Sequence, residues 1–270
     1  MKILRVVLPA AVLIYAGICA ILYFIQDHLL FFPCRVTAAE LDARAHKGRF
    51  VPWENSRGEI IGWKSTEGDP AKTLLVCHGN GGFALESRYK DLNSDKACKL
   101  YLLEYPGYGT RSGTPSTQGF VDAATDALDS LHMELPTRKI WLVGESMGTG
   151  TVCAAAAARP NLIAGIVLVV PFDNLGSAAA AHVRWLPVRL LLRHHLDSDQ
   201  NLKKYHGPVA FVVAGNDGIT PSRLGQRLYD SYAGPKRLWL FPKLGHGDRD
   251  DFFAHWPEYA RWLFAQPAPH

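Results

Sequence analysis

The sequence predicts an α/β fold in which crossover helices connect the strands of one mostly parallel central sheet. The first observation is a set of short, almost continuously apolar runs, among them Ile140–Val143 and Ile163–Val170, which are typical of strands covered on both faces. The second is that segments of helical length separate these runs. The third is size, because a chain of 270 residues, 48% of them hydrophobic, can bury one such core as a single domain.

The elements are expected in a regular order after an apolar N-terminal segment. Phe50–Trp53 and Glu59–Lys64 alternate enough to form an antiparallel hairpin at the start of the sheet. The other expected strands are Thr73–Cys77, Leu100–Glu104, Ile140–Val143, Ile163–Val170, Val209–Ala214 and Arg237–Phe241. The expected helices are Phe83–Asp91, Thr117–Met133, Met147–Ala158, Pro221–Tyr232 and Asp250–Phe264. Residues 266–270 are expected to form a disordered tail.

The N-terminal segment is a candidate membrane anchor. Val6–Ile25 holds 20 residues without a charge, about the length that crosses a bilayer. The main alternative is a cleaved signal peptide, but the apolar run exceeds a typical signal core and continues beyond the small residues at positions 19 and 20. We therefore expect an uncleaved anchor over residues 1–28, with a transmembrane helix at about residues 6–25, and one folded domain over residues 29–265.

The basic residues around the anchor bear on its orientation. Lys2 and Arg5 on the short side favour a cytoplasmic N-terminus, which puts the folded domain on the opposite side of the membrane. Four basic residues between positions 35 and 49 follow the span and weaken this prediction.

The motif Gly-Glu-Ser-Met-Gly at residues 144–148 follows an expected strand and precedes a helix rich in small residues. A strand, a sharp turn and a helix in this order predict an elbow that exposes the hydroxyl of Ser146 at the carboxyl end of the sheet. Gly144 and Gly148 omit side chains that such a turn would push into its neighbours. An isolated motif of this kind also occurs in Gly/Ser loops, and a serine is a weak nucleophile without a base. The interpretation therefore depends on partner residues.

Asp217 and His246 are the expected partners of Ser146. Each follows the end of an expected strand, so all three lie at the same edge of a parallel sheet. The chain order Ser, Asp, His is the one expected of α/β-hydrolases. His246 is expected to take the proton of Ser146, and Asp217 to hold the imidazole. Asp173 and Asp248 are alternative acids, and Asp217 is preferred because it follows the penultimate strand.

The loop at residues 78–82, His-Gly-Asn-Gly-Gly, follows the strand Thr73–Cys77. Its glycines let main-chain N–H groups approach a substrate closely. In α/β-hydrolases one amide of this loop and the amide after the nucleophile form the oxyanion hole, which assigns that role to Asn80 and Met147. His78 is expected to be a structural residue of the turn. A phosphate-binding loop is excluded, because neither glycine-rich phosphate motif follows the strand.

A longer set of motifs resembles one family. Residues 104–116, Glu-Tyr-Pro-Gly-Tyr-Gly-Thr-Arg-Ser-Gly-Thr-Pro-Ser, are similar to the D-Y-x-G-Y-G-x-S-x-G-x-P-S stretch of the Bem46-like serine hydrolases, membrane-anchored members of the α/β-hydrolase superfamily. Four further blocks match in order: His78–Gly82, Gly144–Gly148, Asp217–Pro221 and Gly245-His246. The resemblance covers about residues 29–263 and implies the α/β-hydrolase fold and cleavage of an ester or thioester. Glu104 stands where the family more commonly has Asp, which leaves the predicted site unchanged.

Residues 175–205 interrupt the alternation of strands and helices, at a place where such folds often carry a cap over the active site. One interpretation is an apolar lid that contacts an acyl chain, with Arg184, Arg189 and Arg193 facing lipid headgroups or an anionic substrate. The other is an ordinary amphipathic surface helix at His182–Arg193 whose arginines are solvated. The sequence leaves both open.

Charge and motif spacing exclude other classes of function. A net charge of +4, from 29 basic and 25 acidic residues, comes without a basic block, so nucleic-acid binding is not expected. The 11 histidines and five cysteines show no metal-ligand spacing, and neither a metal nor a cofactor is expected. Spacing alone does not decide whether Cys34 and Cys98 pair.

These features predict an anchored serine hydrolase that cleaves a carboxylic ester or thioester through a covalent acyl-enzyme. The expected partners are a small acyl ester or thioester, lipid-like esters included, and the membrane through the N-terminal helix. An acyltransferase or amidase would use the same residues, and a non-catalytic scaffold is the alternative from another class. The presence of both Ser146 and His246 argues against the scaffold.

Overall fold

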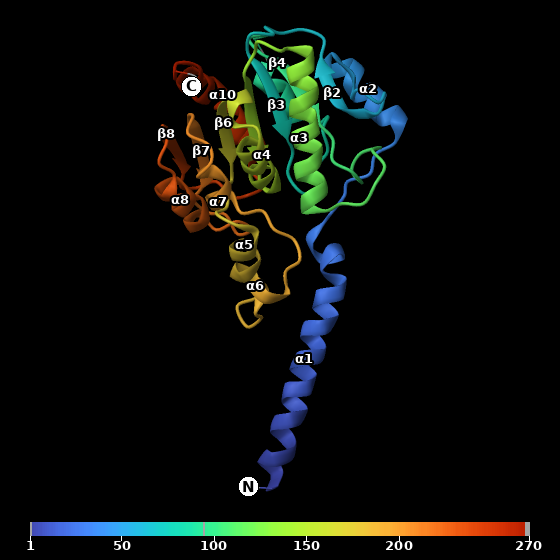
Figure 1. Cartoon of the computed structure of the whole chain (residues 1–270), viewed down its shortest axis with the longest axis vertical. Coiled ribbons are helices and arrows are strands. Elements are labelled where there is room, and N and C mark those ends of the chain that lie inside the picture. Colours follow the sequence, from blue (N-terminus) through green and yellow to red (C-terminus); the bar gives the residue numbers. More distant parts are fainter. Residues whose placement is uncertain (1, 94, 268–270) are drawn as a thin grey trace.

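An eight-stranded sheet forms the centre of the molecule, with the strand order β1-β2-β4-β3-β5-β6-β7-β8 (Figure 1). The computed structural model describes residues 2–93 and 95–267 and, within the first helix, side chains from residue 7 onward. The strands are β1 (Phe50–Glu54), β2 (Ile60–Ser65), β3 (Thr73–Cys77), β4 (Lys99–Leu103), β5 (Ile140–Glu145), β6 (Ile163–Val169), β7 (Val209–Ala214) and β8 (Lys236–Phe241).

The sheet is parallel except at one edge. β2 is antiparallel to β1 and β4, which confirms the predicted hairpin, and every pair from β4 to β8 is parallel. β3, β6 and β7 are buried along their whole length, as their continuous apolar sequences predict. The register sets Cys77 beside Gly144 and Gly144 beside Leu168, so neighbouring strands end at one edge. The predicted fold class is confirmed.

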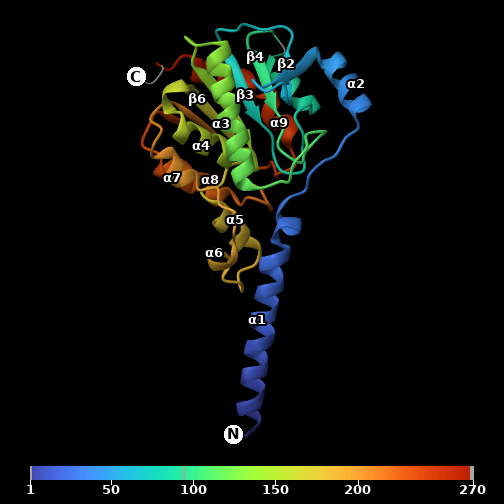
Figure 2. The same ribbon diagram turned by 45° about the vertical axis from the view of Figure 1, so that its right-hand side comes forward.

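Helices cover both faces of the sheet (Figure 2). Buried side chains of three helices form one hydrophobic cluster with the first face: α3 (Thr117–Glu134), α4 (Met147–Ala158) and α8 (Ser222–Ser231). A second cluster on the other face includes α2 (Ala38–Gly48), the 3₁₀ helix η1 (Ser87–Asn93), α9 (Arg249–Ala254) and α10 (Trp256–Phe264). A short 3₁₀ turn, η2 (Pro160–Leu162), leads into β6. The crossover helices of the predicted fold are therefore present on both faces.

Three local features differ from the sequence prediction. The sequence patterns above do not predict α2, a helix in which Leu41 and Ala45 are the buried residues among 11. The expected helix Phe83–Asp91 is present only as η1. The expected helix Asp250–Phe264 is divided into α9 and α10, because Pro257 near the start of α10 has no N–H to continue the preceding helix.

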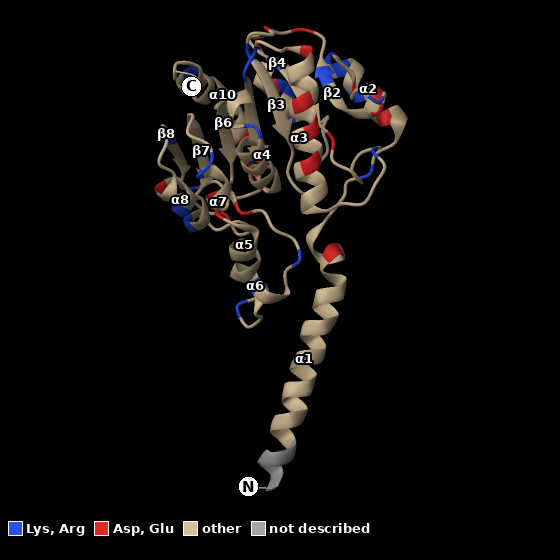
Figure 3. Cartoon of the chain, in the orientation of Figure 1, with Lys and Arg blue, Asp and Glu red and all other residues tan. Residues whose placement is uncertain are grey.

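The helix α1 (Lys2–Leu30) extends away from the sheet (Figures 1 and 3). Its stretch Val7–Leu30 is long and apolar enough to cross a membrane. Among the described side chains of this stretch, Asp27 is the one Asp, Glu, Lys or Arg residue. This arrangement is consistent with a single-pass membrane protein. The side chains of Lys2 and Arg5, and residues 268–270 of the tail predicted at 266–270, lie outside the described residues.

Between β6 and β7 the chain forms α5 (Leu175–His182), α6 (Val188–Leu191) and α7 (Ser198–Leu202). We call this insertion, at about residues 175–205, the cap. Its helices α5 and α6 protrude from the sheet edge and lie beside α1 (Figures 1 and 2), and the O–H of Tyr15 donates to the carbonyl oxygen of Trp185 (3.0 Å). The single amphipathic helix considered for His182–Arg193 does not form, because Pro187 disfavours a helical residue before it, and α6 has four residues.

Candidate active site

β5 carries Ser146 to the carboxyl edge of the sheet, and α4 begins at the next residue. Ser146 has φ 51° and ψ −115°, a conformation that residues other than glycine rarely adopt. The flanking glycines make this turn possible. A Cβ on Gly144 would lie 2.5 Å from the carbonyl oxygen of Gly148, and a Cβ on Gly148 would lie 2.1 Å from the carbonyl oxygen of Cys77. The chain thus forms a strand–turn–helix elbow with Ser146 at its apex.

A chain of hydrogen bonds joins Ser146, His246 and Asp217. Oγ of Ser146 lies 3.0 Å from Nε2 of His246, and Nδ1 of the same ring lies 2.8 Å from Oδ2 of Asp217. An ionised carboxylate only accepts hydrogen bonds, so Nδ1 carries the ring proton and Nε2 presents its lone pair to the serine hydroxyl. The three residues are 8–9% exposed. The structure therefore brings together three residues that are distant in the chain, with 100 positions between Ser146 and His246.

Thr220 belongs to the same hydrogen-bonded group. Its hydroxyl donates to Oδ2 of Asp217 (2.8 Å), and the main-chain N–H groups of Ile219 and Thr220 donate to Oδ1 (2.8 and 2.7 Å). Burial alone would raise the pKa of Asp217, but the hydrogen bond and charge of His246 together with these donors hold that pKa below its ordinary value. Sequence reasoning misses Thr220, although it lies in the block 217–221 that carries the family resemblance.

The two alternative acids have other partners. Oδ2 of Asp173 accepts from Nε and Nη2 of Arg227 (3.0 and 2.6 Å). Oδ2 of Asp248 accepts from the main-chain N–H of Gly245 (2.8 Å). Of the three candidate acids, Asp217 is the one whose carboxylate is hydrogen-bonded to His246.

The loop after β3 passes close to the elbow. A Cβ on Gly79 would lie 3.3 Å from the Cβ of Ser146, so only a glycine allows this approach without displacement. His78 is fully buried, with Nε2 3.0 Å from Oε1 of Glu104 and Nδ1 2.8 Å from the carbonyl oxygen of Gly79. These contacts hold the turn and agree with a structural role for His78.

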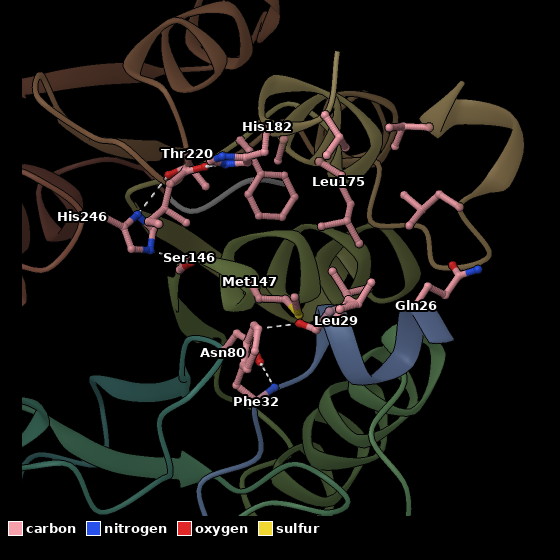
Figure 4. Close-up of a pocket in the computed structure, with 18 of the residues that line it drawn as sticks. Gln26, Leu29, Phe32, Asn80, Ser146, Met147, Leu175, His182, Thr220 and His246 are labelled. Carbon is pink, nitrogen blue, oxygen red and sulfur yellow. Dashed lines mark hydrogen bonds between the residues drawn. The ribbon is translucent and has the colours of Figure 1, made fainter. Parts of the chain in front are cut away.

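Asn80 and Met147 line the same cavity as Ser146. Met147 is the first residue of α4, so its main-chain N–H has no acceptor within the helix. The side chain of Asn80 is directed away from the reaction centre toward the end of α1, and its bonds there are shown in Figure 4. The two residues predicted for the oxyanion hole therefore border one space next to the serine.

Glu145, the second residue of the elbow motif, is a fully buried carboxylate. Its Oε2 accepts from Nε of Arg88 (2.9 Å) and from the O–H of Tyr89 (2.6 Å), and Nε of Arg249 lies 3.2 Å from Oε1. Burial alone would raise the pKa of Glu145, but the charges of the two arginines and the tyrosine hydrogen bond hold it below its ordinary value. Arg249 begins α9, three residues after His246, so this ion-pair cluster connects the elbow to the loop that carries His246.

A cavity of about 600 Å³ opens beside Ser146 (Figure 4). Its lining is mostly apolar and comes from the end of α1, the loop after β3, the elbow and the cap. The size and apolar lining are typical of pockets that bind small molecules. In the part of the chain that the structure describes, no three His, Cys, Asp or Glu side chains are grouped to hold a metal ion.

Known proteins are similar to this chain in sequence and in fold. A family model described as the alpha/beta hydrolase fold matches residues 72–198. A protein of Mycobacterium tuberculosis, named as uncharacterized, is 31% identical over 254 residues, which cover 90% of this chain and 88% of that protein. The chain therefore belongs to the α/β-hydrolase family.

One relative is named as a lipase, and one similar solved structure is named as an esterase. Lysophosphatidylserine lipase ABHD12 of Macaca fascicularis is 26% identical over 212 residues, 69% of this chain and 52% of that protein, so the chain spans about half of that relative's length. Among solved structures, an esterase of Pyrococcus furiosus superimposes with a TM-score of 0.63 at 14% identity, over 87% of this chain and 96% of the esterase. The protein is accordingly a hydrolase enzyme of the α/β-hydrolase fold, and its relatives support ester hydrolysis.

Proposed function

We propose that this protein is a membrane-anchored serine hydrolase that cleaves a carboxylic ester or thioester through a covalent acyl-enzyme. Ser146 is the nucleophile, His246 the general base and Asp217 the acid that orients the imidazole. The observation that carries the proposal is the continuous hydrogen-bonded chain from Oγ of Ser146 through both ring nitrogens of His246 to Asp217. The same geometry serves serine hydrolases of unrelated folds, in which roles are recognised from such contacts.

The chemistry follows from these positions. Oγ of Ser146 attacks the carbonyl carbon of the substrate while Nε2 of His246 accepts the hydroxyl proton. The carbonyl oxygen becomes an oxyanion, for which the main-chain N–H groups of Asn80 and Met147 are the donors. His246 then returns the proton to the departing alcohol or thiol. Water, deprotonated by His246, attacks the acyl-enzyme, releases the carboxylic acid and restores Ser146.

The proposed substrate is a lipid-like acyl ester. The cavity beside Ser146 is mostly apolar, and one relative is named a lysophosphatidylserine lipase. An apolar acyl group gains about 25 cal/mol for each Å² that it removes from water in such a cavity. The motifs at residues 104–116 and 217–221 further favour the Bem46-like branch of the family.

The membrane arrangement is part of the proposal. Residues 1–28 form the anchor, residues 29–265 form the catalytic domain with a cap insertion at about 175–205, and the N-terminus is cytoplasmic. The apolar stretch Val7–Leu30 supports the anchor, and the two basic residues before it support the orientation. In sealed right-side-out vesicles, added protease should remove a tag placed after residue 270, whereas a protected tag would reverse the orientation.

Labelling with a fluorophosphonate tests the assignment of the nucleophile. The full chain in detergent should react with the probe at Ser146, and Ser146→Ala should abolish both labelling and ester hydrolysis without unfolding, because Ser146 lies in a turn. Ser112→Ala, which changes a serine in a surface loop, is the matched control and should label fully. Labelling that persists in Ser146→Ala would overturn the proposal, and an unlabelled wild-type chain would favour the non-catalytic scaffold.

A further inference from the structure

The last turns of α1 form one wall of the cavity beside Ser146. Leu22, Gln26, Leu29 and Leu30 of α1, with Phe32 just after it, line this cavity, and the facing wall comes from the cap. We call residues 22–32 the α1 end. Figure 4 shows Ser146 at one end of the cavity and Gln26 at the other, with Leu29 and Phe32 between the helix and the loop after β3. The helix that would cross the membrane is thus continuous with the wall of the active site.

Hydrogen bonds attach the α1 end to the cap. Gln26 is 8% exposed; its Nε2 donates to the carbonyl oxygen of Leu191 (3.2 Å), and its Oε1 accepts from the main-chain N–H of Arg193 (2.8 Å). Next to it, Oδ1 of Asp27 lies 2.7 Å from both Nη2 of Arg193 and Nε2 of His194. A buried amide that loses such partners leaves polar groups unsatisfied, which is costly. The α1 end is therefore held against the cap by specific contacts.

A second set of hydrogen bonds attaches the α1 end to the loop after β3. Nδ2 of Asn80 donates to the carbonyl oxygen of Leu30 (2.7 Å), and Oδ1 of Asn80 accepts from the main-chain N–H of Phe32 (3.0 Å) and from the O–H of Tyr108 (2.7 Å). The carbonyl of Leu30 is at the end of a helix and has no donor within it. The residue whose main-chain N–H is proposed to bind the oxyanion is thus held by the α1 end.

We infer that the α1 end is part of the acyl-binding site, and that the enzyme selects esters with a long apolar acyl chain, which lies between α1 and the cap. This inference rests on the proposed function. The reacting carbonyl is bound at Ser146, and Gln26 lies at the other end of the cavity. Leu22 also lines the cavity and precedes Gln26 by one helical turn, so only a long acyl chain extends to Leu22. A short acyl group stays near Ser146 and leaves this wall uncovered. Chain-length selectivity is then a property of the anchor helix.

A bulky side chain at Leu22 tests the inference in the full chain in detergent. The probes are p-nitrophenyl butyrate and p-nitrophenyl palmitate, and the readout is the ratio of kcat/KM for the long ester to kcat/KM for the short one. Leu22→Trp should lower this ratio about tenfold or more, the size of discrimination that a change in an apolar pocket gives. Ile21→Trp is the matched control, because Ile21 is the neighbouring residue on α1 and is 60% exposed. It should leave the ratio unchanged.

A second variant guards against displacement of the helix. Leu22→Ala enlarges the cavity instead of filling it. In assays with esters of increasing length, Leu22→Trp should shorten the longest acyl chain that is hydrolysed, and Leu22→Ala should leave that length unchanged or greater. Fluorophosphonate labelling of each variant reports whether the reaction centre is intact. A labelled Leu22→Trp with the wild-type ratio would overturn the inference and leave the proposed function standing. An equal loss on both esters would also overturn it, and failure of the wild type to label would instead refute the proposed function.

Discussion

The sequence offers three aspartates as the acid that orients His246, and hydrogen bonds distinguish Asp217 from Asp173 and Asp248. The two carboxylate oxygens of Asp217 are engaged by His246, by the hydroxyl of Thr220 and by two main-chain N–H groups. This set of donors leaves the carboxylate one orientation, in which it fixes the tautomer of His246. The same donors stabilise the ionised form of Asp217.

Replacing Asp217 by Asn should lower kcat by about 10⁴-fold, because an amide in this place favours the wrong imidazole tautomer, as in other enzymes with these three residues. Initial rates on a p-nitrophenyl ester measure the effect. Asp248→Asn is the comparison, since its carboxylate bonds to Gly245, and it should retain most of the activity. A nearly silent Asp217→Asn together with a severe loss in Asp248→Asn or Asp173→Asn would show that the acid is misassigned.

The lowered pKa values of Asp217 and Glu145 predict how stability depends on pH. Their ordinary values are 3.8 and 4.5, and both groups lie below them in the folded protein. A carboxyl group with a lower pKa in the folded state contributes stability above its unfolded pKa and loses it as the pH falls through the folded value. The free energy of unfolding due to these groups should therefore stay constant above about pH 5 and decline below it. Urea unfolding over this range measures the decline, which should be shallower in Asp217→Asn; an equal slope would contradict the assignment.

At the scale of elements, Glu145 joins three pieces of the fold. Glu145 is the last residue of β5, Arg88 belongs to η1, and Arg249 is the first residue of α9. The elbow and the loop with His246 are therefore positioned by one buried ion-pair cluster. Such a cluster is sensitive to the loss of one partner, because the remaining charge is left buried.

Arg88→Met should accordingly lower the free energy of unfolding by about 3 kcal/mol, since it leaves the fully buried carboxylate of Glu145 without its main partner. The exposed pair of Arg44 and Glu40 provides the control, and Arg44→Met should change stability by less than about 1 kcal/mol. Urea unfolding in detergent compares the two. Equal small effects would mean that water or another donor replaces Arg88.

Sequence patterns predict the elements of this fold where one physical rule dominates. Continuous apolar runs predict the fully buried strands β6 and β7, and the glycines on either side of Ser146 predict the elbow. The patterns fail where tertiary contacts decide, as in α2, which buries two side chains. They also miss the cluster around Glu145 and the role of Thr220, because charged pairs and hydroxyl contacts depend on residues brought together only by folding. The residues expected at the reaction centre lie together, whereas the contribution of α1 to the cavity has no signature in the sequence.

At the scale of the whole molecule, an apolar helix about 29 residues long carries the sheet domain at its end. The full chain should stay in the membrane fraction through high salt and alkaline carbonate, because a spanning helix is held by apolar transfer and not by charge. Deletion of residues 1–25 should release a domain that still hydrolyses a small soluble ester, since Gln26 and the residues after it remain. Extraction of the full chain by carbonate, or a mature N-terminus near Ile21 by mass spectrometry, would refute the anchor.

The hydrogen bonds of Asn80 have a mechanical consequence. A transmembrane helix tilts to match the thickness of the bilayer around it. Leu30 and Phe32, at the end of the proposed transmembrane helix α1, are hydrogen-bonded to the side-chain amide of Asn80, which lies in the loop beside the reaction centre. We therefore expect a change of tilt to be transmitted to this loop through hydrogen bonds of about 3 Å. We expect the rate of catalysis to depend on bilayer thickness, so the same chain in thin and thick vesicles should turn over a soluble ester at different rates.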